Sequence, residues 1–143
     1  MHQLTSEDYQ NLLAFRTGLR RFQHWSQTRA RAVGLPPAQH QLLLAIKGHR
    51  GQTGPAVGDL AGYLLLRPHS TVELVDRAQA GGLVERWSDG DDARFTRVRL
   101  TADGEKRLEQ LAAAHLEELQ RLAPVLDQLA AASGTASTDG AAP

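Results

Sequence analysis

The first part of the chain has apolar residues at every third or fourth position. One such stretch runs from a candidate N-cap at Ser6 to Gly34, and its apolar stripe consists of Leu12, Phe15, Leu19, Phe22 and Trp25. A second stretch runs from Pro36 and Pro37 to about Gly48 and carries Leu42, Leu43, Ala45 and Ile46. This spacing predicts two amphipathic helices with no strand between them.

Two shorter helices are predicted next, on either side of a tight turn. Pro55 is a suitable first-turn residue for the earlier helix, whose apolar stripe is Val57, Leu60, Ala61 and Leu64. Pro68 begins the later helix, which ends at Gly81 and Gly82 and whose stripe is Val72, Val75 and Ala78. Two short helices across a tight turn form a helix-turn-helix, although this turn lacks the frequent Gly.

The spacing changes to alternation after Gly82. Residues 83–87 and 95–100 are short and β-prone, and the polar, turn-rich residues 88–94 separate them. The pattern predicts a hairpin with a long tip, which is a wing. In its second strand Arg97 and Arg99 project from the face opposite Val98 and Leu100.

A final long helix is predicted from an N-cap at Thr101, with the stripe Leu108, Leu111, His115, Leu119 and Leu122. Pro124 is expected to kink or break it, and the low-complexity residues 131–143 are expected to be disordered. The chain is therefore interpreted as one domain over residues 1–130. Its winged lobe spans 36–100, between long helical segments at 4–33 and 102–130.

Composition narrows the class of protein. The 143 residues include no cysteine, which excludes disulfide scaffolds, thiolate zinc sites and thiol-oxidation switches. The apolar runs are too short to cross a bilayer and the first residues lack a signal-peptide pattern, so we expect a cytoplasmic protein with no membrane partner. No common catalytic motif is present and the six His residues are scattered, so we expect no enzyme, no metal and no cofactor.

The distribution of charged residues along the chain is more informative than the net charge, which is zero. Residues 9–58 contain no acidic side chain but seven basic ones, whereas residues 101–130 contain six acidic and three basic side chains. Helices of opposite charge are suited to pack together, within one chain or across a dimer. The neutral sum is unusual for a nucleic-acid-binding domain.

Three sequence blocks follow one another around the predicted hairpin. They are residues 73–86 (ELVDRAQAGGLVER), residues 92–94 (DAR) and residues 98–104 (VRLTADG). In order and spacing they resemble the MarR family of bacterial transcriptional regulators. The resemblance implies a mainly α fold with a small β-hairpin wing, a winged helix-turn-helix with long N- and C-terminal dimerisation helices. It also implies a homodimer that represses transcription from a pseudo-palindromic operator in double-stranded DNA until a small ligand releases it.

The start of the fourth helix carries the candidate DNA contacts Arg67, Pro68, His69, Ser70, Thr71 and Glu73. Arg can grip guanine, Ser and Thr reach bases or phosphates, and Glu can accept a hydrogen bond from cytosine N4. The alternatives are helix-terminus hydrogen bonds for Ser70 and Thr71, simple exposure for His69, and a Glu73 that faces away.

In the wing, the resemblance implies that Asp92 orients Arg94 toward the minor groove. Arg86 and Arg97 either contact phosphates or are ordinary strand-face charges, and the same alternatives apply to Arg99. An internal ion pair between Asp76 and Arg77 is expected to brace the helix-turn-helix.

Family members often bind ligands where the first, second and last helices meet the DNA-binding lobe. Candidates there for a small aromatic or anionic effector are Arg16, Arg20, Phe22, His24, Trp25 and His40, although aromatic residues at the helical spacing of Phe22 and Trp25 more often belong to a core or dimer interface. The expected dimer contacts are Leu4, Leu12, Leu111, His115, Leu119 and Leu122. The neutral charge and acidic wing tip keep one alternative open, a winged-helix module for protein interaction or DNA architecture without small-molecule sensing.

Overall fold

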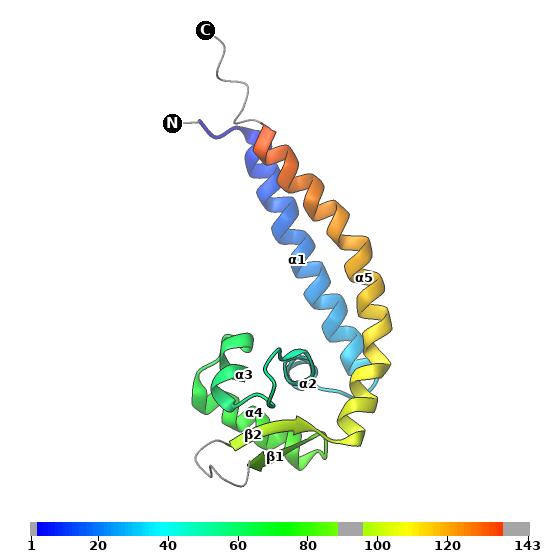
Figure 1. The fold of residues 1–143 in the computed structure, drawn as a ribbon. Coiled ribbons are helices and arrows are strands. Elements are labelled where there is room, and N and C mark those ends of the chain that lie inside the picture. Colours follow the sequence, from blue (N-terminus) through cyan, green and yellow to red (C-terminus); the bar gives the residue numbers. More distant parts are fainter. Residues whose placement is uncertain (1–2, 89–95, 136–143) are drawn as a thin grey trace. The chain divides into compact units, whose positions relative to one another are not determined.

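The computed structural model describes residues 3–88 and 96–135. In chain order its elements are α1 (Ser6–Ala32), α2 (Pro37–Gly48), α3 (Val57–Leu64), α4 (Pro68–Ala80), β1 (Val84–Ser88), β2 (Thr96–Leu100) and α5 (Ala102–Thr135) (Figure 1). The predicted order of elements is confirmed, and so is the mainly helical fold class with its hairpin. Within the described ranges, no helix combines the length and apolarity needed to cross a membrane.

The chain divides into two compact units, and the division falls inside both long helices. We call residues 29–112 the lobe, and the described residues 3–28 and 113–135 the helix pair. The lobe contains α2, α3, α4 and the hairpin, together with the end of α1 and the start of α5.

The lobe closes a hydrophobic core of its own. Helices, hairpin and the root of α5 all contribute to it, with Leu35, Leu42, Leu43, Leu60, Val75, Val84 and Val98 almost completely buried. β1 and β2 pair antiparallel, with Val84 opposite Leu100 and Ser88 opposite Thr96. This core holds α4 on one side and the hairpin on the other.

A short extended segment before α3 adds to the hairpin. Ala56 bridges to Arg97, and the Val98 amide donates to the Pro55 carbonyl at 2.9 Å. The prediction that Pro55 lies in the first turn of the third helix is therefore wrong. The helix begins at Val57, and the Asp59 carboxylate caps it by accepting from the Ala56 amide at 2.9 Å.

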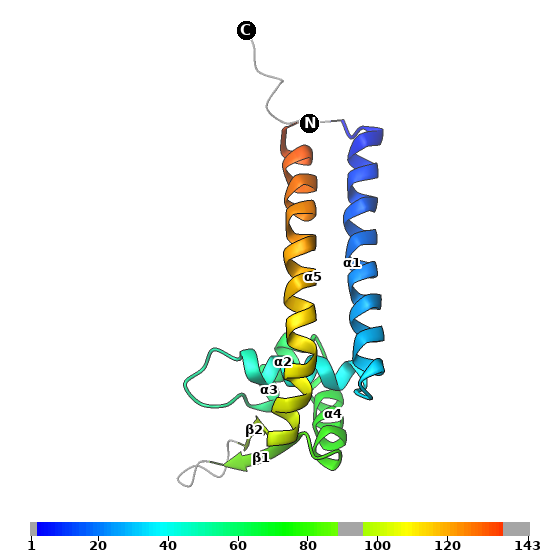
Figure 2. The same ribbon diagram turned by 90° about the vertical axis from the view of Figure 1, so that its right-hand side faces the viewer.

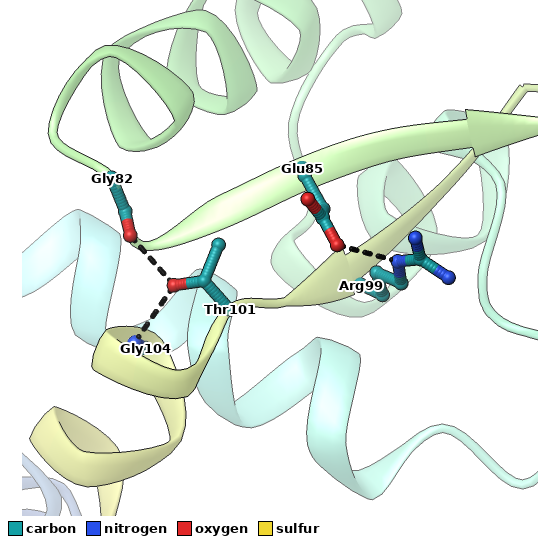
Figure 3. Close-up of polar contacts among 5 residues, drawn as sticks. All are labelled: Gly82, Glu85, Arg99, Thr101 and Gly104. Carbon is teal, nitrogen blue, oxygen red and sulfur yellow. Dashed lines mark hydrogen bonds and ion pairs between the residues drawn. The ribbon is translucent and has the colours of Figure 1, made fainter.

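Thr101 joins the hairpin to the root of α5 (Figure 3). Its hydroxyl donates to the Gly82 carbonyl at 2.6 Å and accepts from the Gly104 amide at 3.1 Å, which confirms the predicted N-cap. A Cβ atom at Gly104 would lie 2.0 Å from the Leu83 carbonyl oxygen, so the close approach of α5 to the chain before β1 requires glycine. This is the physical reason for the Thr and Gly of the third sequence block.

In the helix pair, α1 and α5 run antiparallel and side by side (Figures 1 and 2). α1 starts with a capping box in which the Asp8 amide donates to the Thr5 hydroxyl at 3.2 Å and the Thr5 amide donates to the Asp8 carboxylate at 2.8 Å. The N-cap is therefore Thr5, one residue before the predicted Ser6. None of residues 3–28 and 113–133 is buried.

α5 is longer than predicted, because it passes Pro124 without a break and continues to Thr135. Proline removes one amide donor from the helix, but Gln120 and Pro124 are both exposed, so water can satisfy the Gln120 carbonyl. Residues 131–135, which we expected to be disordered, are helical. Residues 136–143 lie outside the described part of the chain.

Candidate nucleic-acid interface

The buried face of α4 decides which predicted DNA contacts are accessible. That face consists of Thr71, Leu74, Val75 and Ala78, which share one side of a helix. The predicted stripe is therefore confirmed at Val75 and Ala78 but wrong at Val72, which is 39% exposed, whereas Thr71 is fully buried. The Thr71 hydroxyl donates to the Arg67 carbonyl at 3.0 Å, one turn earlier, so Thr71 is a core packing residue and not a DNA contact.

The first two turns of α4 keep most of the other predicted contacts accessible. Arg67, Pro68, His69 and Glu73 are exposed and Ser70 is half-buried. Val72, three residues after His69, lies on the same outward side, and sequence reasoning missed it. These side chains offer a cation, an imidazole, a carboxylate and two methyl groups, all of which can contact base edges in a major groove.

Arg86 is half-buried, and both terminal nitrogens of its guanidinium have partners within the lobe. It donates to the Gln79 side-chain oxygen and to the Asp76 carboxylate, both at 2.5 Å. The phosphate contact of Arg86 stays a prediction, and Asp76 pairs with Arg86 rather than with Arg77. Arg86 thereby ties β1 to the last turns of α4 and fixes the helix relative to the hairpin.

The other hairpin arginines that the structure describes also have partners within the lobe. Arg97 is half-buried and donates to the Gly54 carbonyl at 2.7 Å, so it holds the segment before α3, and its phosphate contact stays a prediction. Arg99 pairs with Glu85, its cross-strand neighbour, at 2.7 Å (Figure 3), and its guanidinium lies 5.5 Å from the centre of the Trp87 ring. Asp92 and Arg94 lie outside the described residues.

The predicted effector residues fall into both units. His40 is buried within the lobe, whereas Arg16, Arg20 and His24 are exposed on α1 in the helix pair. Phe22 and Trp25 are half-buried. Within the helix pair, the structure brings Phe22 and Trp25 together.

Phe22 and Trp25 line an open groove of about 730 Å³ in the helix pair. Their ring centres are 6.1 Å apart, and the Trp25 ring lies 4.8 Å from that of His115, whose Nε2 is 2.7 Å from the Ser26 hydroxyl oxygen. The charged residues of the groove are Arg21, Glu118 and Arg121. A hydrogen bond to Glu118, and the charge of Glu118, raise the pKa of Arg121 above its ordinary value.

In the described ranges, no three potential metal ligands gather into a site.

The predicted dimer contacts also fall into both units. Leu4, Leu12 and Leu119 are exposed, and His115 and Leu122 are half-buried, all in the helix pair. Leu111 is different, because it is 3% exposed and belongs to the core of the lobe. The chain itself covers Leu111, so its assignment to a dimer interface is corrected.

A helix-turn-helix followed by a hairpin, with an extended segment before it, defines a winged helix-turn-helix protein. The model of the MarR family matches residues 33–94. The uncharacterized HTH-type transcriptional regulator YsmB of Bacillus subtilis (strain 168) is 34% identical over 64 residues, which cover 45% of this chain and 44% of that protein. The chain thus aligns with less than half the length of this relative.

Solved structures extend the likeness beyond the lobe. The S. aureus MepR–DNA complex superposes with a TM-score of 0.69 at 20% identity and covers 93% of this chain and 96% of that chain. AbsC, a MarR family transcriptional regulator from Streptomyces coelicolor, gives a TM-score of 0.70 at 19% identity and covers 85% and 82%. At these identities the likeness shows the fold. The predicted resemblance to the MarR family is therefore confirmed, by the family model over residues 33–94 and by the fold over most of the chain.

Proposed function

We propose that this protein is a sequence-specific DNA-binding transcriptional regulator whose reading element is the first half of α4. The observation that carries the proposal is an exposed surface of Arg67, His69 and Glu73 on a helix whose opposite face is packed into the core. Arg86 fixes the far end of the same helix. Base-edge contacts need side chains held in a set register, and a packed, clamped helix supplies one.

We propose further that the regulator acts as a homodimer. The helix pair exposes many large apolar side chains, namely Leu4, Tyr9, Leu12, Leu13, Phe15, Leu19, Leu116, Leu119 and Val125. Such a surface is unusual for a monomer in water. A second copy is the partner that fits, because Arg16, Arg20 and Arg21 on α1 complement Glu117 and Asp127 on α5. Two-fold symmetry then predicts a pseudo-palindromic operator with half-sites about one helical turn apart.

The regulatory role that we propose is cytoplasmic repression relieved by a small aromatic or anionic effector. Phe22 and Trp25 would stack on such a molecule in the groove of the helix pair, and Arg21 supplies positive charge there, since Arg121 is paired with Glu118. The groove belongs to the unit that we propose as the dimer contact, so a bound effector would change the spacing of the two reading helices. In the wing, we retain the proposal that Asp92 orients Arg94 into a minor groove.

Selection of duplexes from a random pool by the full-length protein tests the function. We expect enrichment of a pseudo-palindrome, with an affinity that falls steeply as salt is raised. Salt-dependent binding to random duplex without any enriched sequence would contradict sequence-specific regulation and favour the architectural module. No binding to any duplex would favour a protein-interaction module.

A further inference from the structure

Three helices in the described part of the chain are followed by a residue with a left-handed backbone, and only one of these residues is not glycine. α1 is followed by Gly34 and α4 by Gly82, both with φ of +75°, whereas α3 is followed by Leu65 with φ of +54° and ψ of +41°. Glycine is favoured at such positions because a Cβ atom crowds the neighbouring carbonyl. Leu65 therefore holds a conformation that destabilises the fold relative to glycine.

Burial of the Leu65 side chain in the lobe does not offset this strain. Its side chain is 91% exposed, the highest value among the large apolar residues that the structure describes. The turn is closed by backbone hydrogen bonds from the Leu65 and Leu66 amides to the Ala61 carbonyl, which glycine would form equally well. A residue that is both strained and uncovered suggests a contact with a partner.

The position of Leu65 favours DNA as that partner. It lies in the short connection between α3 and α4, followed by Leu66, which is 41% exposed, and then by the exposed residues Arg67, Pro68 and His69. Arg67 and His69 add a cation and a polar ring beside these apolar residues, and this combination suits a nucleic acid better than a purely apolar protein surface. The apolar group that a major groove displays is the C5-methyl of thymine.

We propose that Leu65 contacts a thymine methyl group in each half-site and is a specificity-determining residue. The inference rests on the proposed function, since it requires an operator. It assigns to the turn of the helix-turn-helix a role in base recognition that is separate from the polar contacts of α4.

The test uses the full-length protein and the operator enriched from the random pool, with each thymine replaced in turn by deoxyuridine. This replacement removes only the methyl group. The wild-type protein is expected to lose about fourfold in affinity at one thymine of each half-site, which corresponds to the burial of one methyl group. Leu65→Gly is expected to bind the thymine operator about fourfold more weakly and to lose nothing further at that deoxyuridine. Its thermal midpoint should rise by a few degrees, because the strain is relieved.

Two variants serve as controls. Leu65→Asn tolerates the left-handed backbone without an apolar side chain and is expected to behave like Leu65→Gly. Leu44→Ala removes an exposed leucine of α2 and is expected to keep the wild-type deoxyuridine profile.

Identical deoxyuridine profiles for the wild type and Leu65→Gly would overturn the inference and leave the proposed function standing. Leu65→Gly could instead change the oligomeric state of the DNA-free protein and keep the wild-type deoxyuridine profile. This result would also overturn the inference, in favour of a protein contact. Failure of the wild type to enrich any duplex would overturn the proposed function, and this inference with it.

Discussion

The lobe and the helix pair are built from the same kind of amphipathic sequence, but only the lobe closes a core. In the lobe, Leu42, Leu43 and Leu60 are fully buried, whereas Leu12 in the helix pair is 61% exposed and none of residues 3–28 and 113–133 is buried. Apolar spacing thus predicts where a helix forms and which side of it is apolar, but not what covers that side. The difference is our reason for treating the lobe as self-sufficient and the helix pair as one half of an interface.

The largest effect is expected from charge placed in the helix pair. The double variant Leu12→Glu, Leu119→Glu should convert the dimer into a monomer and raise its dissociation constant more than about a thousandfold, because carboxylates would be buried in an apolar contact. Sedimentation velocity measures the mass. Leu44→Glu, at a lobe leucine that is 57% exposed, is the matched control and should leave the dimer intact. An unchanged mass for the double variant would contradict the proposed interface.

The next effect concerns the packing of the lobe. Gly104→Ala should lower the free energy of unfolding by about 3 kcal/mol, because its Cβ would overlap the Leu83 carbonyl. Urea denaturation measures this change. Gly62→Ala, within α3 with no atom within 4 Å of the added Cβ, should instead raise stability by about 0.5–1 kcal/mol. Equal stability of the two variants would mean that α5 does not pack tightly on the lobe.

A smaller effect separates the two faces of α4. Thr71→Ala should lower the free energy of unfolding by about 1–2 kcal/mol, because it removes a buried hydrogen bond and leaves a gap in the core. Val72→Ala should change stability by less than about 0.5 kcal/mol while it weakens operator binding. Thermal unfolding and operator titration of both variants test this assignment. If Val72→Ala lowered stability and left operator affinity unchanged, Val72 would belong to the buried face, as the sequence pattern predicted.

The smallest effect is a change in the salt dependence of operator binding. Arg67→Ala should reduce the slope of log affinity against log salt by about one, because it removes an exposed cation from the surface that we propose binds DNA. Arg86→Ala should leave the slope unchanged, because Asp76 and Gln79 already hold that guanidinium. Equal slope changes for both variants would show that Arg86 reaches the phosphates after all.

The order of elements was predictable because each kind of element has its own apolar period. The phase of α4 was missed for a specific reason: the predicted stripe omitted Leu74, which with Thr71, Val75 and Ala78 completes the i, i+3, i+4, i+7 pattern. Without Leu74, Val72 was assigned to the core and Thr71 to the surface. Including it would have placed Val72 on the outward face.

The hydrogen-bond partners of the hairpin arginines were not predictable in the same way. Arg86 and Arg97 find partners that are distant in the chain, Asp76 and Gly54, and a strand pattern gives only the face on which a side chain lies. Leu111 likewise continues the stripe of α5, but the lobe covers it and not a second copy. Tertiary partners, rather than local propensity, decided each of these cases.

The mass of the complex on the selected duplex tests the central claim most directly. Sedimentation velocity on saturated operator should give two chains per duplex, with one reading helix on each half-site of the pseudo-palindrome. One chain per duplex at saturation would contradict the account, because a lobe that reads DNA alone would leave the exposed face of the helix pair without its proposed partner.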